Sequence, residues 1–433
     1  MLDRKVVSLS KLGDDRAERV KFQRWIGNKR VTIASLIQAE QERLRPIVKG
    51  RHVLGIQDTT ELNYQKHAGR VSGLGTVGNG KDLGFFIHPM LVLDADTTAC
   101  LGSAAVHIEN RLEGAADNYK KLPIEEKESY RWILTAEKSK KVLSEASCVT
   151  FIGDRENDIY EFIDRIPDEK TRIITRVWHD RRLDDHEDKI FSHLEKQEEA
   201  GRIVIKIPQE KRNKRQKREA VLSIKFSEIT IKRPRPCTDK NAAKTIKVTV
   251  VEAKEIGCPA DQKMVHWILL TTHNVNNFTD AEQIILWYRM RWNVEQVFRT
   301  MKKKGLDVES SQVESAEGLM KLAIIALSAA IQVLQLVLAR DDTTNQKTAD
   351  VFGKEEQVVL SMLLIKLEGK TAKQKNPYLK ENLSWASWVI ARLGGWQGYK
   401  SERPPGPGTM GWGLQRFQGI FDGWKLCKDV CAQ

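Results

Sequence analysis

Four side chains between positions 288 and 302 could act together on a phosphate ester. They are Tyr288, Arg291, Glu295 and Lys302. Successive helix residues are rotated by about 100°, so these positions fall within about 60° of one another on a helix. That face would join a carboxylate, which can bind a divalent cation, to cations that can bind phosphates. We therefore predict a single helix, Asp280–Lys304, with one face that could bind a divalent cation and phosphates.

Trp292 and Arg299 extend this stripe and are further candidates for contact with a nucleic acid. The opposite side is apolar and consists of Val294, Val297, Phe298 and Met301. A surface ladder of salt bridges is the alternative, because Arg291–Glu295 and Glu295–Arg299 are favourable pairs four residues apart. A ladder explains the charges but not the tyrosine and tryptophan beside them. Aromatic rings that can stack on bases favour a nuclease.

Two further carboxylates, Asp58 and Asp154, each follow a short apolar run. The runs are His52–Gln57 and Cys148–Gly153. If both are neighbouring strands, the two carboxylates project from one edge of a sheet. Together with a third acid they could hold a pair of hard divalent ions. The alternative is structural, because Asp154 could simply cap a helix predicted at Glu156–Ile166.

The elements that must position these acids change in type along the chain. Apolar runs predict strands at Gly84–Asp94 and Ala99–Ile108, and a charged helix is predicted at Glu125–Ala146. Further strands are predicted at Arg172–Val177, Arg202–Ile207, Ala220–Phe226, Ile246–Glu252 and Val265–Thr271. From Asp280 onward the chain is expected to be largely helical. This order predicts an α/β fold with a mixed sheet flanked by helices.

The composition favours a polyanionic partner. In this chain of 433 residues, 71 Lys and Arg against 58 Asp and Glu give a formal net charge of +13. The longest apolar run, Leu322–Ala339, is interrupted by Ser328, Gln332 and Gln335, so a buried helix is expected rather than a membrane span. The start of the chain lacks the apolar segment of a signal peptide, and the six cysteines form no CxxC pair. We therefore expect a cytoplasmic protein without a membrane partner.

One segment is strongly basic. Lys206–Arg218 holds seven basic residues and one acid. Its centre consists of Lys211, Arg212, Lys214 and Arg215. A basic β-ribbon along a DNA backbone is one interpretation, and a solvated hairpin tip is the other.

The spacing of the first four residues also carries a family resemblance. Tyr288-x2-Arg291-x3-Glu295-x6-Lys302 matches the YREK signature of bacterial cut-and-paste DDE transposases of the insertion-sequence-four family. GIQDTTELNY around Asp58 and IGDRENDIYEF around Asp154 resemble the two aspartate segments of that family. GFFIHPMLVL resembles its second strand, and ARLGG with PPGPGTMGWG resembles its C-terminal segment. The resemblance runs from about residue 11 to the end.

The resemblance implies a ribonuclease H-like catalytic domain in which Asp58, Asp154 and Glu295 bind Mg²⁺, with Mn²⁺ able to substitute. It also implies DNA-binding roles for Tyr288, Arg291 and Lys302 on the phosphates, for Trp267 and Trp292 on a flipped base, and for Arg176 beside that base. The implied reaction is cleavage of transposon ends, hairpin formation and opening, and strand transfer into target DNA.

Three regions are expected. They are a helical basic DNA-binding region at 1–50, a catalytic domain at 51–305 with a β-rich insertion at about 170–275, and a helical dimerisation region at 306–433. Only 57 residues precede Asp58, so the part that reads the transposon end is expected to be shortened. A DNA-binding, dimerising inhibitor of transposition is therefore one alternative, and a general nuclease of the same fold is another.

The expected partners are double-stranded DNA, at the inverted repeats and at the target, and a second copy of the chain. After the turn at Pro405–Gly408, Leu414, Phe417, Phe421 and Trp424 recur at helical spacing. This stripe could pack against its own chain or pair two protomers. Because an identical patch can serve both subunits, we expect a weak dimer through residues after about 410.

Overall fold

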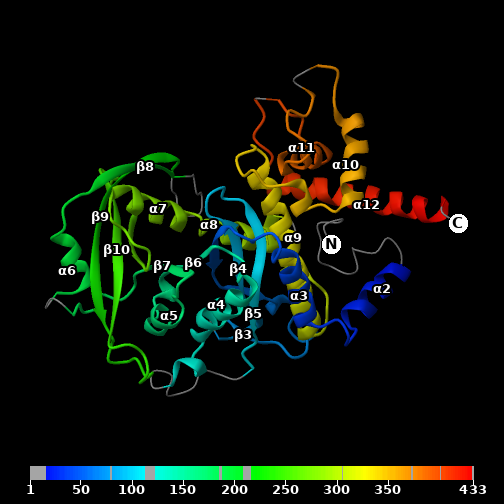
Figure 1. Ribbon diagram of the computed structural model, residues 1–433. Helices are drawn as coiled ribbons and strands as arrows, with labels where there is room; N and C mark the ends of the chain where they lie inside the picture. The colour runs from blue at the N-terminus through cyan, green and yellow to red at the C-terminus, as the bar shows by residue number, and fades with distance from the viewer. Residues whose placement is uncertain are drawn as a thin grey trace. The chain divides into compact units, whose positions relative to one another are not determined.

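The chain forms two compact units (Figure 1). The computed structural model describes residues 16–78, 80–112, 122–184, 188–207, 216–304, 306–371, 374–399 and 401–431. Unit 1 comprises Met1–Arg51, Thr59–Gly114 and Trp292–Gln433, and unit 2 comprises His52–Asp58 and Ala115–Arg291. The three regions expected from the sequence stay a prediction.

Unit 2 is built on strands that follow one another in the order β1–β6–β7–β11–β10–β9–β8. Their bounds are β1 His52–Gln57, β6 Cys148–Gly153, β7 Thr171–Arg176, β8 Gly201–Ile207, β9 Arg218–Lys232, β10 Thr245–Ile256 and β11 His266–Thr271. β1, β6 and β7 pair in parallel, whereas the pairs from β7–β11 to β9–β8 are antiparallel. In β1 and β6 every residue after the first is buried, as near-continuous apolar runs in a covered parallel sheet require.

The predicted strands of unit 2 are confirmed, but β9 and β10 are longer than predicted. The two strands pair without interruption, from Val221 opposite Ile256 to Lys232 opposite Thr245. Exposed and buried residues alternate along much of β9, so one face of this hairpin meets water. The apolar runs in the sequence therefore marked only the central part of each strand.

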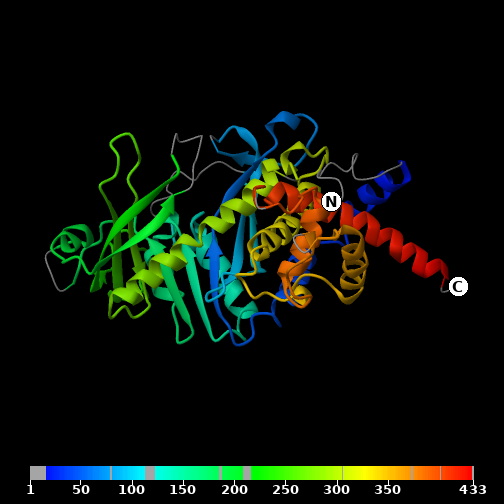
Figure 2. The ribbon, with the colours of Figure 1, turned by 90° about the horizontal axis from the view of Figure 1, so that it is seen from above.

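The helices of unit 2 depart further from prediction. They are η4 Ile124–Glu126, α4 Tyr130–Val142, η5 Arg155–Asn157, α5 Tyr160–Arg165, α6 Ile190–Glu195 and α7 Phe278–Arg289. The helix predicted at Glu125–Ala146 is shorter, because Leu143 leaves the helical conformation and ends it. The helix predicted at Glu156–Ile166 is divided, because the extended backbone of Ile159 separates η5 from α5. Figure 2 shows α7 lying along β9 and β10, which it contacts.

The described residues of unit 1 contain a smaller antiparallel group of strands, preceded by the helices α2 and α3. The bounds are α2 Arg16–Ile26, α3 Ile33–Leu44, β2 Thr60–Asn63, η2 Gln65–His67, β3 Gly75–Val77, β4 Asp82–Asp94 and β5 Cys100–Glu109. β4 pairs with β2, β3 and β5. The strands predicted at Gly84–Asp94 and Ala99–Ile108 correspond to β4 and β5 and are confirmed.

The rest of unit 1 is helical. Its elements are α8 Trp292–Arg299, the π-helix η6 Thr300–Lys304, η7 Val308–Ser310, α9 Ala316–Ala339, η8 Thr348–Asp350, α10 Lys354–Leu367, α11 Leu383–Leu393 and α12 Pro407–Cys431. α9 is long and apolar enough to cross a membrane, but most of it is buried inside the unit, as in a soluble core helix. The Gln335 amide, which interrupts its apolar run, donates to the carbonyl oxygen of Cys100 (3.1 Å). The predicted buried helix is confirmed.

The apolar stripe of α12 belongs to the core of unit 1. Leu414, Phe417 and Phe421 are buried against residues of α9, α10 and α11, and Trp424 packs on the same cluster. In Figure 1, α10, α11 and α12 gather around one end of α9. The stripe is therefore not a free dimer contact, and the expectation that it pairs protomers is wrong. Its side chains are already buried by their own chain.

Candidate active site

Asp58 and Asp154 lie at the same edge of the unit 2 sheet. β1 and β6 are parallel neighbours, with Ile56 opposite Ile152. Asp58 is the first residue after β1, and Asp154 is the first after β6. The carboxyl edge of parallel strands is where sites in open α/β sheets form. The placement of the two aspartates at neighbouring strand ends is thus as predicted.

Asp58 forms an ion pair with Arg291. The Nη1 atom of Arg291 donates to Oδ2 of Asp58 at 2.8 Å. The two side chains are only 17% and 16% exposed, so water shields the pair weakly. The arginine expected to contact DNA phosphate therefore also balances the charge of the first aspartate.

Asp154 combines a capping role with an accessible position. Its Oδ1 accepts the backbone N–H of Glu156 at 3.0 Å, which caps η5. A carboxylate has several acceptor lone pairs, so one cap bond leaves others for a metal ion or water. Asp154 is thus a helix cap, as the structural alternative predicted, and this role does not exclude metal binding.

The residues beside Asp154 are closely packed. A Cβ atom at Gly153 would lie 2.4 Å from the side chain of Asn157, so glycine fits at the end of β6. Asn157 is completely buried, and within the described residues neither polar atom of its amide has a hydrogen-bond partner. A buried amide without a partner is costly, and ordered water or an ion commonly satisfies such a group.

The single helix predicted at Asp280–Lys304 is wrong. α7 ends at Arg289, Met290 and Arg291 form a turn, and α8 begins at Trp292. The Arg291 N–H donates to the Tyr288 carbonyl at 3.0 Å, three residues back. This tighter turn rotates the residues of α8 about the chain axis relative to those of α7. The π-helix η6, which begins at Thr300, changes the direction of the side chains again. Tyr288, Arg291, Glu295 and Lys302 therefore do not share one regular helical face.

Glu295, Trp292, Arg299 and Lys302 belong to unit 1. Glu295 is partly exposed on α8, and the Arg299 guanidinium lies 5.9 Å from the centre of the Trp292 ring. Lys302 lies 3.8 Å from a carboxylate oxygen of Glu309. The predicted apolar side is confirmed, because Val294, Val297, Phe298 and Met301 are all buried. The assembly of Glu295 with the two aspartates stays a prediction.

Trp267, Tyr288 and Arg176 come together within unit 2. The Trp267 and Tyr288 rings meet edge to face, with centres 5.7 Å apart. Tyr288 is buried, which raises its pKa, whereas Trp267 is partly exposed and so is not a core tryptophan. The Arg176 side chain donates to the His266 carbonyl at 2.9 Å, and burial lowers its pKa. The cluster joins β7, β11 and α7.

The predicted basic loop lies outside the described residues. Lys211, Arg212, Lys214 and Arg215 fall within 208–215. Their role in DNA binding stays a prediction.

The donor chemistry at the sheet edge suits a hard divalent cation. Asp58 and Asp154 offer only oxygen ligands, which Mg²⁺ and Mn²⁺ accept. Across the described ranges, no group of three or more His, Cys, Asp or Glu side chains is arranged to hold a metal ion. The metal-binding role of the two aspartates stays a prediction.

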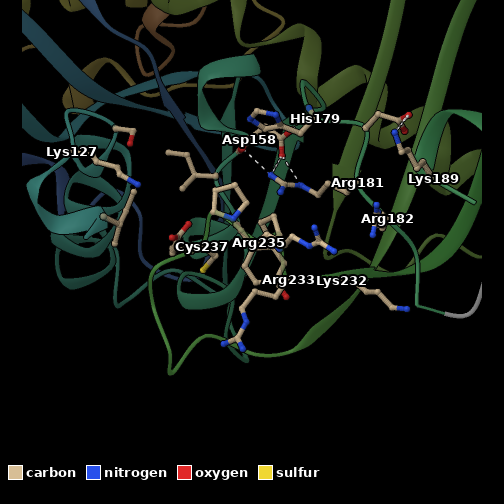
Figure 3. Close-up of a pocket in the computed structure, with 18 residues that line it drawn as sticks. Lys127, Asp158, His179, Arg181, Arg182, Lys189, Lys232, Arg233, Arg235 and Cys237 are labelled. Carbon is tan, nitrogen blue, oxygen red and sulfur yellow. Dashed lines mark hydrogen bonds and ion pairs between the residues drawn. The ribbon is translucent and has the colours of Figure 1, made fainter. Parts of the chain in front are cut away.

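Unit 2 contains a basic cavity that the sequence did not predict. It has a volume of about 670 Å³ and lies between α5, the loop after β7 and the end of β9 (Figure 3). Basic residues outnumber acids in its lining, with Lys127, Arg181, Arg182, Lys189, Lys232, Arg233 and Arg235 against Asp158, Glu161 and Asp180. Its residues come from distant segments, so no local motif reveals it.

Residues 141–331 match a family model described as the transposase DDE domain. The match supports a DDE transposase. It includes Asp154, Trp267 and the whole Tyr288–Lys302 segment, and it begins after Asp58. A DDE transposase domain implies a ribonuclease H-like fold, and the mixed sheet with flanking helices in unit 2 agrees with it. It also implies an enzyme that acts on DNA with divalent metal ions.

Proposed function

We propose that this protein is a Mg²⁺-dependent cut-and-paste transposase of the insertion-sequence-four family, in the transposon-five branch. One observation carries the proposal: residues 141–331, which include Asp154, match a transposase DDE domain. The placement of Asp58 and Asp154 after adjacent parallel strands supports it. The proposed β-rich insertion spans about 170–275, from β7 to β11. The cytoplasm is the proposed location.

Asp58, Asp154 and Glu295 are the proposed ligands of Mg²⁺, with Mn²⁺ able to substitute. When bound, the metal would activate the attacking oxygen and stabilise the leaving oxygen at each step. Tyr288, Arg291 and Lys302 would hold the phosphates of the cleaved strand.

Trp267 is proposed to receive the base that leaves the DNA stack when a hairpin forms, with Trp292 as its support and Arg176 beside it. The partly exposed indole can stack on a base, and the guanidinium beside it can bind a phosphate. The buried tyrosine ring supports the indole from its edge.

A second copy of the chain is the proposed protein partner, because two DNA ends must be held together. Since the inner stripe of α12 is buried, the contact is assigned to the outer side of that helix. Leu426 and Val430 are exposed there by 67% and 66%.

Cleavage of defined DNA tests this function. The purified chain would be incubated with a duplex that ends in the inverted repeat bordering its gene, and with a duplex of shuffled sequence. We expect Mg²⁺-dependent nicking and hairpin formation on the first duplex only. Binding without cutting would indicate an inhibitor of transposition, and equal cutting of both duplexes would indicate a general nuclease.

A further inference from the structure

Trp178 is an exposed tryptophan for which the proposed function has no role. Its side chain is 58% exposed, whereas Trp132 in the same unit is 1% exposed. Large aromatic residues exposed beside a functional edge are typical of binding surfaces.

The backbone places Trp178 between two parts of the candidate site. β7 lies between β6, which precedes Asp154, and β11, which carries Trp267. The Thr175 hydroxyl donates to the Asp154 carbonyl at 3.4 Å on one side. On the other side, the Val177 N–H donates to the Ile268 carbonyl at 2.8 Å. Trp178 directly follows this connection.

A buried carboxylate fixes the loop that carries Trp178. Asp158 Oδ2 accepts the backbone N–H groups of Trp178 (2.8 Å) and His179 (2.7 Å). Its Oδ1 pairs with Arg181 at 2.6 Å, and the Asp158 side chain is fully buried (Figure 3). The loop is thus ordered before any ligand binds, which lowers the entropic cost of binding.

Arg155 adds a cation to this aromatic surface. Its guanidinium lies 5.2 Å from the centre of the Trp178 ring, within cation–π range. Arg155 is exposed and directly follows Asp154 in the chain. An indole that can stack on a base, with a guanidinium that can bind a phosphate, is the combination that holds single-stranded nucleic acid.

We propose that Trp178 and Arg155 form a second base-stacking surface, which holds an unpaired DNA base next to the strand that lies at Asp154. The surface would keep the strand end separated from its complement while the hairpin forms or opens. This inference rests on the proposed function, because it needs DNA with unpaired bases at this edge.

Binding of two DNA probes in EDTA, which prevents cutting, tests the inference. One probe is a fully paired end duplex. The other is a set of duplexes whose terminal bases are unpaired. Each member of the set carries 2-aminopurine at a different unpaired position. We expect Trp178→Ala to weaken binding of the unpaired probe by about tenfold and to leave the paired probe unchanged, as loss of one stacking contact predicts. At one position it should also raise 2-aminopurine fluorescence, because the base loses its stacking partner.

Matched variants separate stacking from folding. Trp178→Phe should restore most of the binding, and Val204→Ala, at a 62% exposed position of β8, should change neither probe. Arg155→Ala should lower by about one the slope of log affinity against log salt.

Three results would overturn the inference. One is unchanged binding of the unpaired probe by Trp178→Ala, and another is equal weakening of both probes. The third is a loss of self-association by Trp178→Ala, which would assign the ring to a protein contact. Failure of the wild-type chain to bind either probe would overturn the proposed function as well.

Discussion

At the level of single residues, Arg291 couples the proposed binding of metal to the proposed binding of DNA phosphate. Its ion pair with Asp58 neutralises a carboxylate that is also the first proposed metal ligand. A positive charge 2.8 Å from that carboxylate opposes the approach of a divalent cation. Arg291 can therefore bind a DNA phosphate most readily when a metal ion takes over the charge of Asp58.

Removing this charge should change metal affinity and DNA affinity in opposite directions. We expect Arg291→Gln to bind Mn²⁺ several-fold more tightly without DNA, since a competing cation is lost, and to bind end DNA more weakly. Titration calorimetry measures the first effect and gel shift the second. Arg289→Gln, two residues away at the end of α7, is the matched control. Unchanged or weaker Mn²⁺ binding by Arg291→Gln would refute the coupling.

Secondary-structure elements show what the sequence could reveal. β1 and β6 were predicted with correct bounds, because buried parallel strands are near-continuous apolar runs that end at polar residues. The break between α7 and α8 was not predictable from periodicity. It depends on the Arg291 N–H bonding three residues back, which leaves no mark on the apolar pattern. The exposed position of Trp178 was not predictable, because the loop that carries it is held by hydrogen bonds to Asp158, a residue distant in sequence.

We expect a buried histidine to make unit 2 sensitive to acid. His273 lies beside β1 and β6, where its Nε2 and the Thr150 hydroxyl are 2.8 Å apart. Burial, and then the charges of His52 and Arg172, lower its pKa from 6.5 to about 3. In the folded chain it stays neutral between these values, whereas in the unfolded chain it takes up a proton below about 6.5.

The free energy of unfolding of unit 2 should therefore fall as the pH drops from 6.5 towards 3. The contribution is fully present above pH 6.5, and the slope approaches about 1 kcal/mol per pH unit in that window. Urea unfolding at several pH values measures it. His273→Gln, which cannot titrate, should reduce the slope, and His179→Gln at an exposed position should not. Equal slopes for wild type and His273→Gln would contradict the assignment.

At the scale of the whole molecule, the proposed reaction requires two copies of the chain and two DNA ends. Deletion of α12 cannot test this, because Leu414, Phe417 and Phe421 are core residues of unit 1. The exposed outer positions Leu426 and Val430 can be changed without opening that core.

Charged substitutions on this outer side should block pairing and spare folding. We expect the double variant Leu426→Glu and Val430→Glu to bind single DNA ends normally and to lose paired-end complexes in a gel shift. Like charges on a self-complementary contact repel each other across the two-fold axis. Met362→Glu, at a 51% exposed position of α10, is the control. Persistence of paired-end complexes in the double variant would place the contact elsewhere.

The central claim is that Asp154 acts through its charge, and one substitution isolates that charge. Asparagine is as good a helix cap as aspartate, so Asp154→Asn can keep the bond to the Glu156 N–H while it loses the anion. The control is Asp168→Asn. Asp168 also accepts a backbone N–H, but it precedes β7, so it lies at the edge of the sheet opposite to that of Asp154. The measurement is the rate of Mg²⁺-dependent nicking of end DNA by three folded proteins. We predict that wild type and Asp168→Asn cut and that Asp154→Asn binds DNA but does not cut. Nicking by Asp154→Asn at the wild-type rate would contradict the account.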